Sequence, residues 1–95
     1  MLRLIVDENI AFADKAFAQF GKVNLMPGRE INNSNLNDVD VLIVRSITNV
    51  DKDLLKNTPV KFVGTATIGT DHIDLDYLKS KNIFLRMLRV VMLIP

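Results

Sequence analysis

Short apolar runs alternate with polar stretches along the whole chain. Five of these runs have the length and composition of strands, and they span residues 2–6, 22–26, 39–44, 60–63 and 83–85. The run over 39–44 is almost continuously aliphatic, which is typical of a strand buried on both faces. The pattern therefore predicts five strands separated by short connections.

Helical spacing occupies the segments between these runs. The predicted helices cover residues 10–20, 52–56 and 71–79 or 74–79, with a loop or one short helix over 32–38. Gly21 follows the first of them as a helix stop. Strands that alternate with helices through short connections imply a parallel sheet with helices on both faces. We therefore predict an α/β, flavodoxin-like domain with a parallel five-stranded sheet flanked by helices.

Composition limits the classes of function. The chain has 95 residues, enough for one small domain, and no cysteine, so disulfides, zinc–cysteine sites and thiol nucleophiles are excluded. Lysine and arginine number 12 against 11 acids, but Arg86 and Arg89 lie in the last ten residues, which contain no acid. The rest has no basic excess of the kind that nucleic-acid binding requires.

The start of the chain and its longest apolar run bear on location. Asp7 and Glu8 interrupt the stretch where a signal peptide needs its apolar core. No apolar run reaches the roughly 20 residues that span a bilayer. We expect a cytoplasmic protein with no membrane partner.

Polar residues gather where the predicted strands end. In parallel sheets, ligands bind beyond the carboxyl ends of the strands. Those ends carry Asp7-Glu8, Arg45-Ser46 and the small-residue loop 64–70. The loop amides either cradle an anion or form a turn packed under a helix, and spacing alone leaves both open.

The individual polar residues have plainer interpretations as well. Asp7-Glu8 is most simply a solvated helix start, where acids suit the helix dipole. Arg45 and Ser46 are most simply a surface arginine and a helix cap. His72 is the only histidine, and it lies beside a capping aspartate. This setting is more typical of a structural residue than of a general base.

Three other chemistries fit poorly. A phosphate-accepting receiver domain needs an aspartate at the end of the third strand, where this chain has Arg45-Ser46. The segment 64–70 has the glycines of a P-loop but lacks its lysine. The Gly-x-Gly-x-x-Gly dinucleotide fingerprint is absent from the sequence.

Four segments together resemble a known family. They are VDEN at 6–9, PGR at 27–29, VRS at 44–46 and KFVGTATIGTDHID at 61–74. Over residues 1–85 the chain is similar to the start of the D-isomer-specific 2-hydroxyacid dehydrogenases, in the branch that acts on 4-phosphoerythronate. By motif position, the resemblance implies that Ser46 and Thr67 contact substrate.

The resemblance also implies an activity and its partners. The family oxidises the 2-hydroxyl of a small phosphorylated hydroxy acid with NAD, here in pyridoxal 5′-phosphate synthesis, and its intact enzymes in this branch are homodimers. Its catalytic arginine, acid and histidine, and its NAD motif, have no counterpart in these residues. We therefore expect residues 1–85 to form the substrate domain, with no catalytic, cofactor or metal residue in this chain and no dehydrogenase activity of its own. A free-standing binding module for a phosphorylated acid is the alternative.

Residues 86–95 break the pattern of the body. The family continues here with a segment like Leu-Ala-Asn-Ala-Pro-Gly-Cys-Asn-Ala-Asn-Ser. Written in codons and regrouped one base over, that segment permits every residue of the chain from 85 to 95. We expect this tail to be encoded in a shifted frame and to extend the last strand or to pack poorly.

Overall fold

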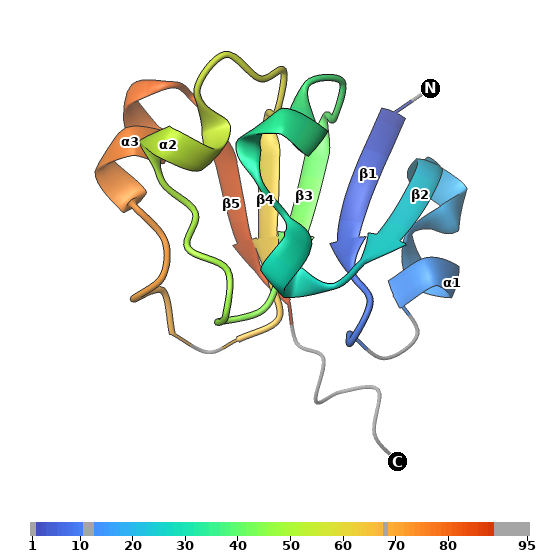
Figure 1. Ribbon diagram of the computed structural model, residues 1–95. Coiled ribbons are helices and arrows are strands. Elements are labelled where there is room, and N and C mark those ends of the chain that lie inside the picture. Colours follow the sequence, from blue (N-terminus) through green and yellow to red (C-terminus); the bar gives the residue numbers. More distant parts are fainter. Residues whose placement is uncertain (1, 11–12, 68, 89–95) are drawn as a thin grey trace.

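Five parallel strands form a single sheet at the centre of the computed structural model, which describes residues 2–10, 13–67 and 69–88. The strands are β1 (Leu2–Asp7), β2 (Gly21–Met26), β3 (Val41–Val44), β4 (Phe62–Thr65) and β5 (Phe84–Met87). Their order in the sheet is β2–β1–β3–β4–β5, and all arrows in Figure 1 point to the same edge. This is the predicted flavodoxin-like α/β topology.

Short helices connect the strands and cover both faces of the sheet. They are α1 (Ala13–Phe17), α2 (Lys52–Leu55) and α3 (Leu75–Ser80), with 3₁₀ turns over Ala18–Phe20, Gly28–Glu30 and Asn33–Leu36. In Figure 1, α2 and α3 lie near β4 and β5, and α1 lies beside β2. Within the described ranges, no helix is long and apolar enough to cross a membrane.

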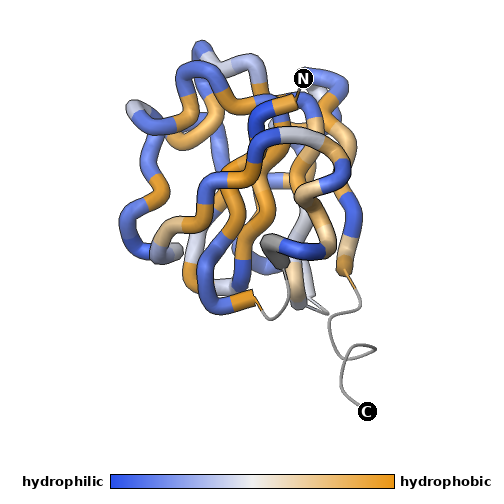
Figure 2. Tube along the Cα trace, turned by 90° about the vertical axis from the view of Figure 1, so that its right-hand side faces the viewer, coloured by the Kyte–Doolittle hydropathy of each residue, from blue (hydrophilic) through white to orange (hydrophobic). Residues whose placement is uncertain are grey.

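The two faces of the sheet bury different amounts of apolar surface. Ile5, Leu42 and Val63 belong to the larger core, to which α2 and α3 contribute leucines. Leu4 and Val6 face the opposite way and form a smaller core with Ile10, Ile43 and α1. Figure 2 shows hydrophobic segments running through the middle of the molecule, between hydrophilic outer stretches. Strand residues therefore alternate between two cores of unequal size.

Several element boundaries differ from the predictions. The strand predicted over 39–44 begins at Val41, and Asp40 lies in a bend before it, where its side chain accepts a hydrogen bond from the Arg3 amide. The strand predicted over 60–63 runs later, as Phe62–Thr65. The helix predicted over 10–20 begins at Ala13 and tightens into the 3₁₀ turn before Gly21.

Gly21 caps the end of the helical segment, as the sequence predicted. It is the first residue of β2, and its backbone is extended. A Cβ at this position would lie 2.1 Å from the Leu2 carbonyl oxygen. Glycine is therefore needed here because β2 approaches β1 closely, not because the chain reverses.

Aspartates cap the two helices of the larger core. Asp51 accepts a hydrogen bond from the Leu54 amide at the start of α2. Asp74 accepts from the Tyr77 amide at the start of α3, so this helix takes the later of its two predicted starts. Each carboxylate therefore satisfies an amide in the first turn of its helix.

The last strand runs past the boundary proposed at residue 85. Arg86 pairs with Gly64 and Met87 with Thr65, and the Leu88 amide donates to the Thr65 carbonyl at 2.8 Å. The first residues of the tail thus extend β5, one of the two expected outcomes. The rest of the tail, 89–95, lies outside the described residues, and its shifted frame stays a prediction.

Candidate functional site

Ser46 and Thr67 line one small pocket at the carboxyl edge of the sheet. Ser46 follows β3 by two residues, and Thr67 follows β4 by two residues. The pocket has a volume of about 180 Å³, and Gly69, Asp71 and His72 complete its lining. The structure therefore brings together the two hydroxyls that the resemblance singled out. Their contact with substrate stays a prediction.

A chain of hydrogen bonds runs behind this pocket. The Thr67 hydroxyl donates to the Gly69 carbonyl at 2.8 Å. The Thr65 hydroxyl lies 2.9 Å from that of Thr67 and 2.8 Å from Nε2 of His72. Thr65 ends β4 and is fully buried, so β4 holds this chain in place.

The surroundings of His72 favour the neutral form of its imidazole. Partial burial lowers the pKa of its imidazole below 6.5, and the neighbouring Asp71 carboxylate opposes this only in part. The His72 carbonyl accepts from the Val50 amide at 2.8 Å, which anchors the residue from behind. The sequence predicted a structural role for His72, and these contacts agree with it, but they also join His72 to the pocket.

The sequence did not single out Thr65 as a site residue. The spacing of Thr65 and Thr67 could have indicated it, because residues two apart on an extended segment point to the same face. The contact with His72 could not be read from this spacing, because only the fold brings His72 within reach of Thr65. Among the described residues, no group of three or more histidine or acidic side chains could hold a metal ion.

Asp7 is buried, which contradicts its interpretation as part of a solvated helix start. It is the last residue of β1 and is 0% exposed, whereas Glu8 is exposed. One carboxylate oxygen, Oδ1, accepts from the Asn9 amide at 2.8 Å. The other, Oδ2, lies 3.0 Å from Nε of Arg45. The interpretation of Arg45 as a plain surface residue is also wrong, since its side chain is only 31% exposed.

This ion pair sits in a tightly packed corner. The two facing atoms are not aligned as a hydrogen bond, and neither has another hydrogen-bond partner in the part of the chain that the structure describes. Gly28 leaves the room that the carboxylate needs, because a Cβ there would lie 2.4 Å from Oδ2 of Asp7. Thr48 holds Gly28 in place by donating to its carbonyl at 3.1 Å. Nε of Arg45, one residue before Ser46, therefore faces the Asp7 carboxylate.

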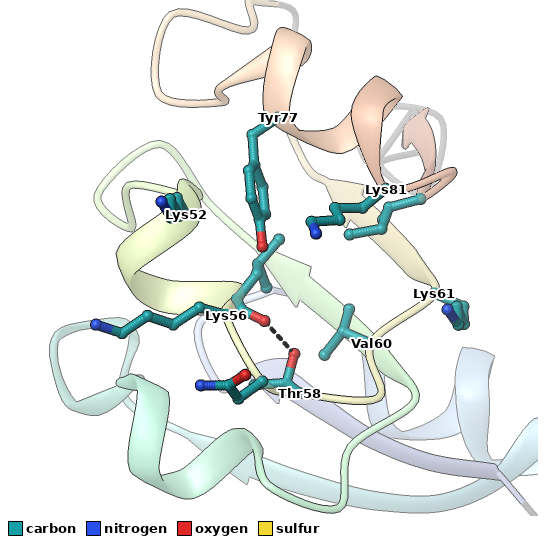
Figure 3. A pocket seen from close by; sticks show the side chains of 10 residues that line it. Lys52, Lys56, Thr58, Val60, Lys61, Tyr77 and Lys81 are labelled. Carbon is teal, nitrogen blue, oxygen red and sulfur yellow. Dashed lines mark hydrogen bonds between the residues drawn. The ribbon is translucent and has the colours of Figure 1, made fainter.

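A larger pocket lies at the opposite, amino edge of the sheet. It has a volume of about 400 Å³, and Figure 3 shows Tyr77 pointing into it among four lysines, Lys52, Lys56, Lys61 and Lys81. These lysines are all exposed. None of the residues predicted to contact substrate lines this pocket, so its size does not make it the candidate site.

An apolar hollow also lies at the amino edge, on the face that α1 covers. Its volume is about 450 Å³, and Leu2, Phe20, Phe62 and Phe84 contribute to its walls. Phe84 is 72% exposed. Asp40 and Lys61 also line the hollow, but none of the residues predicted to contact substrate does.

Most of the chain matches the model of one protein family. Residues 4–87 match the model described as "D-isomer specific 2-hydroxyacid dehydrogenase, catalytic domain". This chain belongs to the D-isomer-specific 2-hydroxyacid dehydrogenases. The family membership agrees with the resemblance drawn from four short motifs.

Curated relatives within this dehydrogenase family include erythronate-4-phosphate dehydrogenases. The chain is 54% identical to that of Hahella chejuensis over 82 residues, which cover 86% of this chain and 22% of the relative. It is 52% identical to that of Salinibacter ruber over 82 residues, covering 86% of this chain and 21% of the relative. The chain therefore spans about a fifth of the length of these relatives.

Solved structures of 2-hydroxyacid dehydrogenases share the fold. The D-lactate dehydrogenase of Aquifex aeolicus, complexed with NAD and lactic acid, matches with a TM-score of 0.72 and 23% identity, over 90% of this chain and 27% of that one. The pyruvate reductase of Chlamydomonas reinhardtii matches with a TM-score of 0.71 and 15% identity, over 93% of this chain and 29% of that one. At these identities the likeness establishes the fold of this dehydrogenase domain.

Proposed function

We propose that this chain is the substrate-binding part of an NAD-dependent dehydrogenase that oxidises the 2-hydroxyl of 4-phospho-D-erythronate to a 2-oxo acid. The product would feed pyridoxal 5′-phosphate synthesis. The observation that carries the proposal is the meeting of Ser46 and Thr67 at one pocket on the carboxyl edge. The identity of 54% to an erythronate-4-phosphate dehydrogenase supports the choice of substrate.

The pocket suits a small, oxygen-rich ligand. Two hydroxyls from neighbouring strand ends can hydrogen-bond carboxylate, hydroxyl or phosphate oxygens. Arg45 next to Ser46 is paired with Asp7, so the chain binds mainly through neutral donors at this point. Such contacts position a substrate more than they attract it electrostatically.

NAD does not fit the residues of this chain. The sequence has no Gly-x-Gly-x-x-Gly fingerprint, and the pocket of about 180 Å³ is too small for a dinucleotide. Hydride acceptance by NAD would therefore depend on parts of the relatives that this chain does not span. In the proposal, Ser46 and Thr67 bind and orient the hydroxy acid.

Titration with 4-phospho-D-erythronate, followed by amide chemical shifts, tests this role. We expect saturable shifts around Ser46 and Thr67, and Ser46→Ala or Thr67→Ala should raise the Kd roughly two- to twelvefold, the equivalent of one neutral hydrogen bond of about 0.5–1.5 kcal/mol. Ser80→Ala is the matched control, because the Ser80 hydroxyl bonds only the Tyr77 carbonyl at the end of α3. Equal affinity in all variants would contradict the proposal.

Turnover by the 95-residue chain provides a second test. Purified chain mixed with NAD and 4-phospho-D-erythronate should produce no NADH, because these residues include neither a dinucleotide fingerprint nor the family's acid–histidine pair. Activity that copurifies with the chain and disappears in Thr67→Ala would overturn this expectation. Binding without turnover would also fit the alternative of a free-standing binding module.

We also propose that residues 85–95 are encoded in a shifted reading frame. The support is the regrouping of the family's codons, which permits each residue of this segment. Sequencing the coding DNA tests the proposal. Restoring one base near codon 84 or 85 should open a frame that reads Ala-Pro-Gly-Cys-Asn. Failure to open it would disprove the shift.

A further inference from the structure

The hydrogen-bond chain behind the pocket has three contacts but only two hydroxyl protons. The contacts join His72 to Thr65, Thr65 to Thr67, and Thr67 to the Gly69 carbonyl, at 2.8, 2.9 and 2.8 Å. Each threonine hydroxyl has one proton, and a carbonyl has none. The third proton must therefore come from the imidazole.

The direction of every bond follows from this count. The Gly69 carbonyl only accepts, so Thr67 donates to it. Because the one hydroxyl proton of Thr67 is used in that bond, Thr65 must donate to Thr67. The hydroxyl proton of Thr65 is then used as well, so Nε2 of His72 must donate to Thr65. Any other arrangement leaves two oxygen lone pairs facing each other at 2.9 Å, or a buried hydroxyl without a proton to share.

We propose that His72 and Thr65 are positioning residues that fix Thr67 as a hydrogen-bond donor at the pocket. In the opposite direction, Nε2 would accept from Thr65 and Thr65 from Thr67, which would leave Thr67 with lone pairs only. As built, Thr67 can exchange the Gly69 carbonyl for a ligand oxygen without disturbing Thr65. The site therefore selects a group that accepts hydrogen bonds, such as a carboxylate or phosphate oxygen. Only this choice of ligand rests on the proposed function.

The direction holds whatever the charge on the imidazole. Nε2 already carries a proton, so protonation of His72 takes place at Nδ1 and leaves the chain unchanged. The charged residues that line a pocket together with His72 are Asp51, Asp71 and Asp74. The backbone of His72 is held by Val50 through its carbonyl. In the neutral ring a proton on Nδ1 would leave Nε2 bare and break the chain at Thr65, so these hydrogen bonds favour the form that carries its proton on Nε2.

The imidazole of the full 95-residue chain gives a direct test, because the sequence has one histidine. Long-range ¹⁵N–¹H correlation spectra identify which ring nitrogen carries the proton in the neutral form. We expect a protonated Nε2 and a bare Nδ1 above the pKa of His72, with or without ligand. A protonated Nδ1 and a bare Nε2 would overturn the inference, even if the pocket binds its ligand.

Variants of Thr65 separate positioning from packing. Thr65→Val should mix the two tautomers and weaken 4-phospho-D-erythronate binding roughly two- to twelvefold, whereas Thr65→Ser should restore both to within about twofold. Thr58→Val is the control, since it also removes a partly buried hydroxyl bond, to the Leu55 carbonyl, far from the pocket. A wild-type tautomer and affinity in Thr65→Val would overturn the inference. If the wild-type chain binds neither 4-phospho-D-erythronate nor inorganic phosphate, the proposed function fails, and the tautomer spectra alone decide the inference.

Discussion

Two ion pairs lie at opposite edges of the same sheet and differ in almost every physical respect. At the amino edge, Arg3 of β1 pairs with Asp38, and both side chains are more than half exposed. At the carboxyl edge, Arg45 pairs with Asp7, whose side chain has no exposed surface. One strand, β1, thus begins at a solvated pair and ends at a buried one.

The difference shows where the fold tolerates a polar group that costs free energy to bury. An exposed pair gains little because water screens both charges. A buried pair roughly offsets its own desolvation, but its separate halves are strongly unfavourable. The carboxyl edge therefore concentrates groups that depend on each other, and the candidate site adjoins them through Ser46.

Loss of Asp7 should have the largest effect on stability. Asp7→Ala leaves the Arg45 guanidinium partly buried without its partner, and should lower the free energy of unfolding by about 3–5 kcal/mol. Asp38→Ala should lower it by less than about 1 kcal/mol. Urea unfolding followed by circular dichroism measures both. Similar losses in the two variants would remove the distinction between the edges.

A methyl group at Gly28 should have a smaller effect at the same edge. Its Cβ would lie 2.4 Å from Oδ2 of Asp7 and 2.7 Å from Cδ1 of Ile47, so Gly28→Ala should cost about 1–3 kcal/mol by overpacking. Gly69→Ala is the matched control, because a Cβ there meets nothing within 4 Å and should change stability by under about 0.5 kcal/mol. A Gly28→Ala variant as stable as Gly69→Ala would show that the corner around Asp7 is loose.

The pH dependence of stability should show the smallest effect, and it comes from His72. Its pKa is lower in the folded chain than the ordinary 6.5, so between these two values the unfolded chain binds more protons. Stability from this source is complete above about pH 6.5 and is lost as the pH falls through the folded pKa. His72→Gln should flatten this part of the profile in thermal unfolding at stepped pH. An unchanged slope would assign it to carboxylates.

The sheet could be predicted because each strand is recognisable from a short stretch of sequence. The buried pair of Asp7 and Arg45 could not be predicted in this way. Runs such as Leu-Arg-Leu-Ile-Val have one dominant interpretation, and their order implies the topology. An acid after such a run resembles a helix start until its partner is known, and Arg45 lies 38 positions beyond Asp7. The predicted pocket residues Ser46 and Thr67 came from motif position. The hydrogen bond between Thr65 and His72 became apparent only from the structure, because the sequence does not specify the shape of the loop between them.

The position of β1 between β2 and β3 has a consequence for the order of events during synthesis. Leu4 lies beside Val41 in the sheet, so one side of the first strand made stays unpaired until 37 more residues have been added. At about 5–20 residues per second, that interval is roughly 2–7 seconds on the ribosome. β2 closes the other side of β1 sooner, since Leu2 pairs with Gly21. During that interval the backbone N–H and C=O groups on the β3 side of β1 have no strand to pair with, and factors that bind nascent chains have that time to reach them.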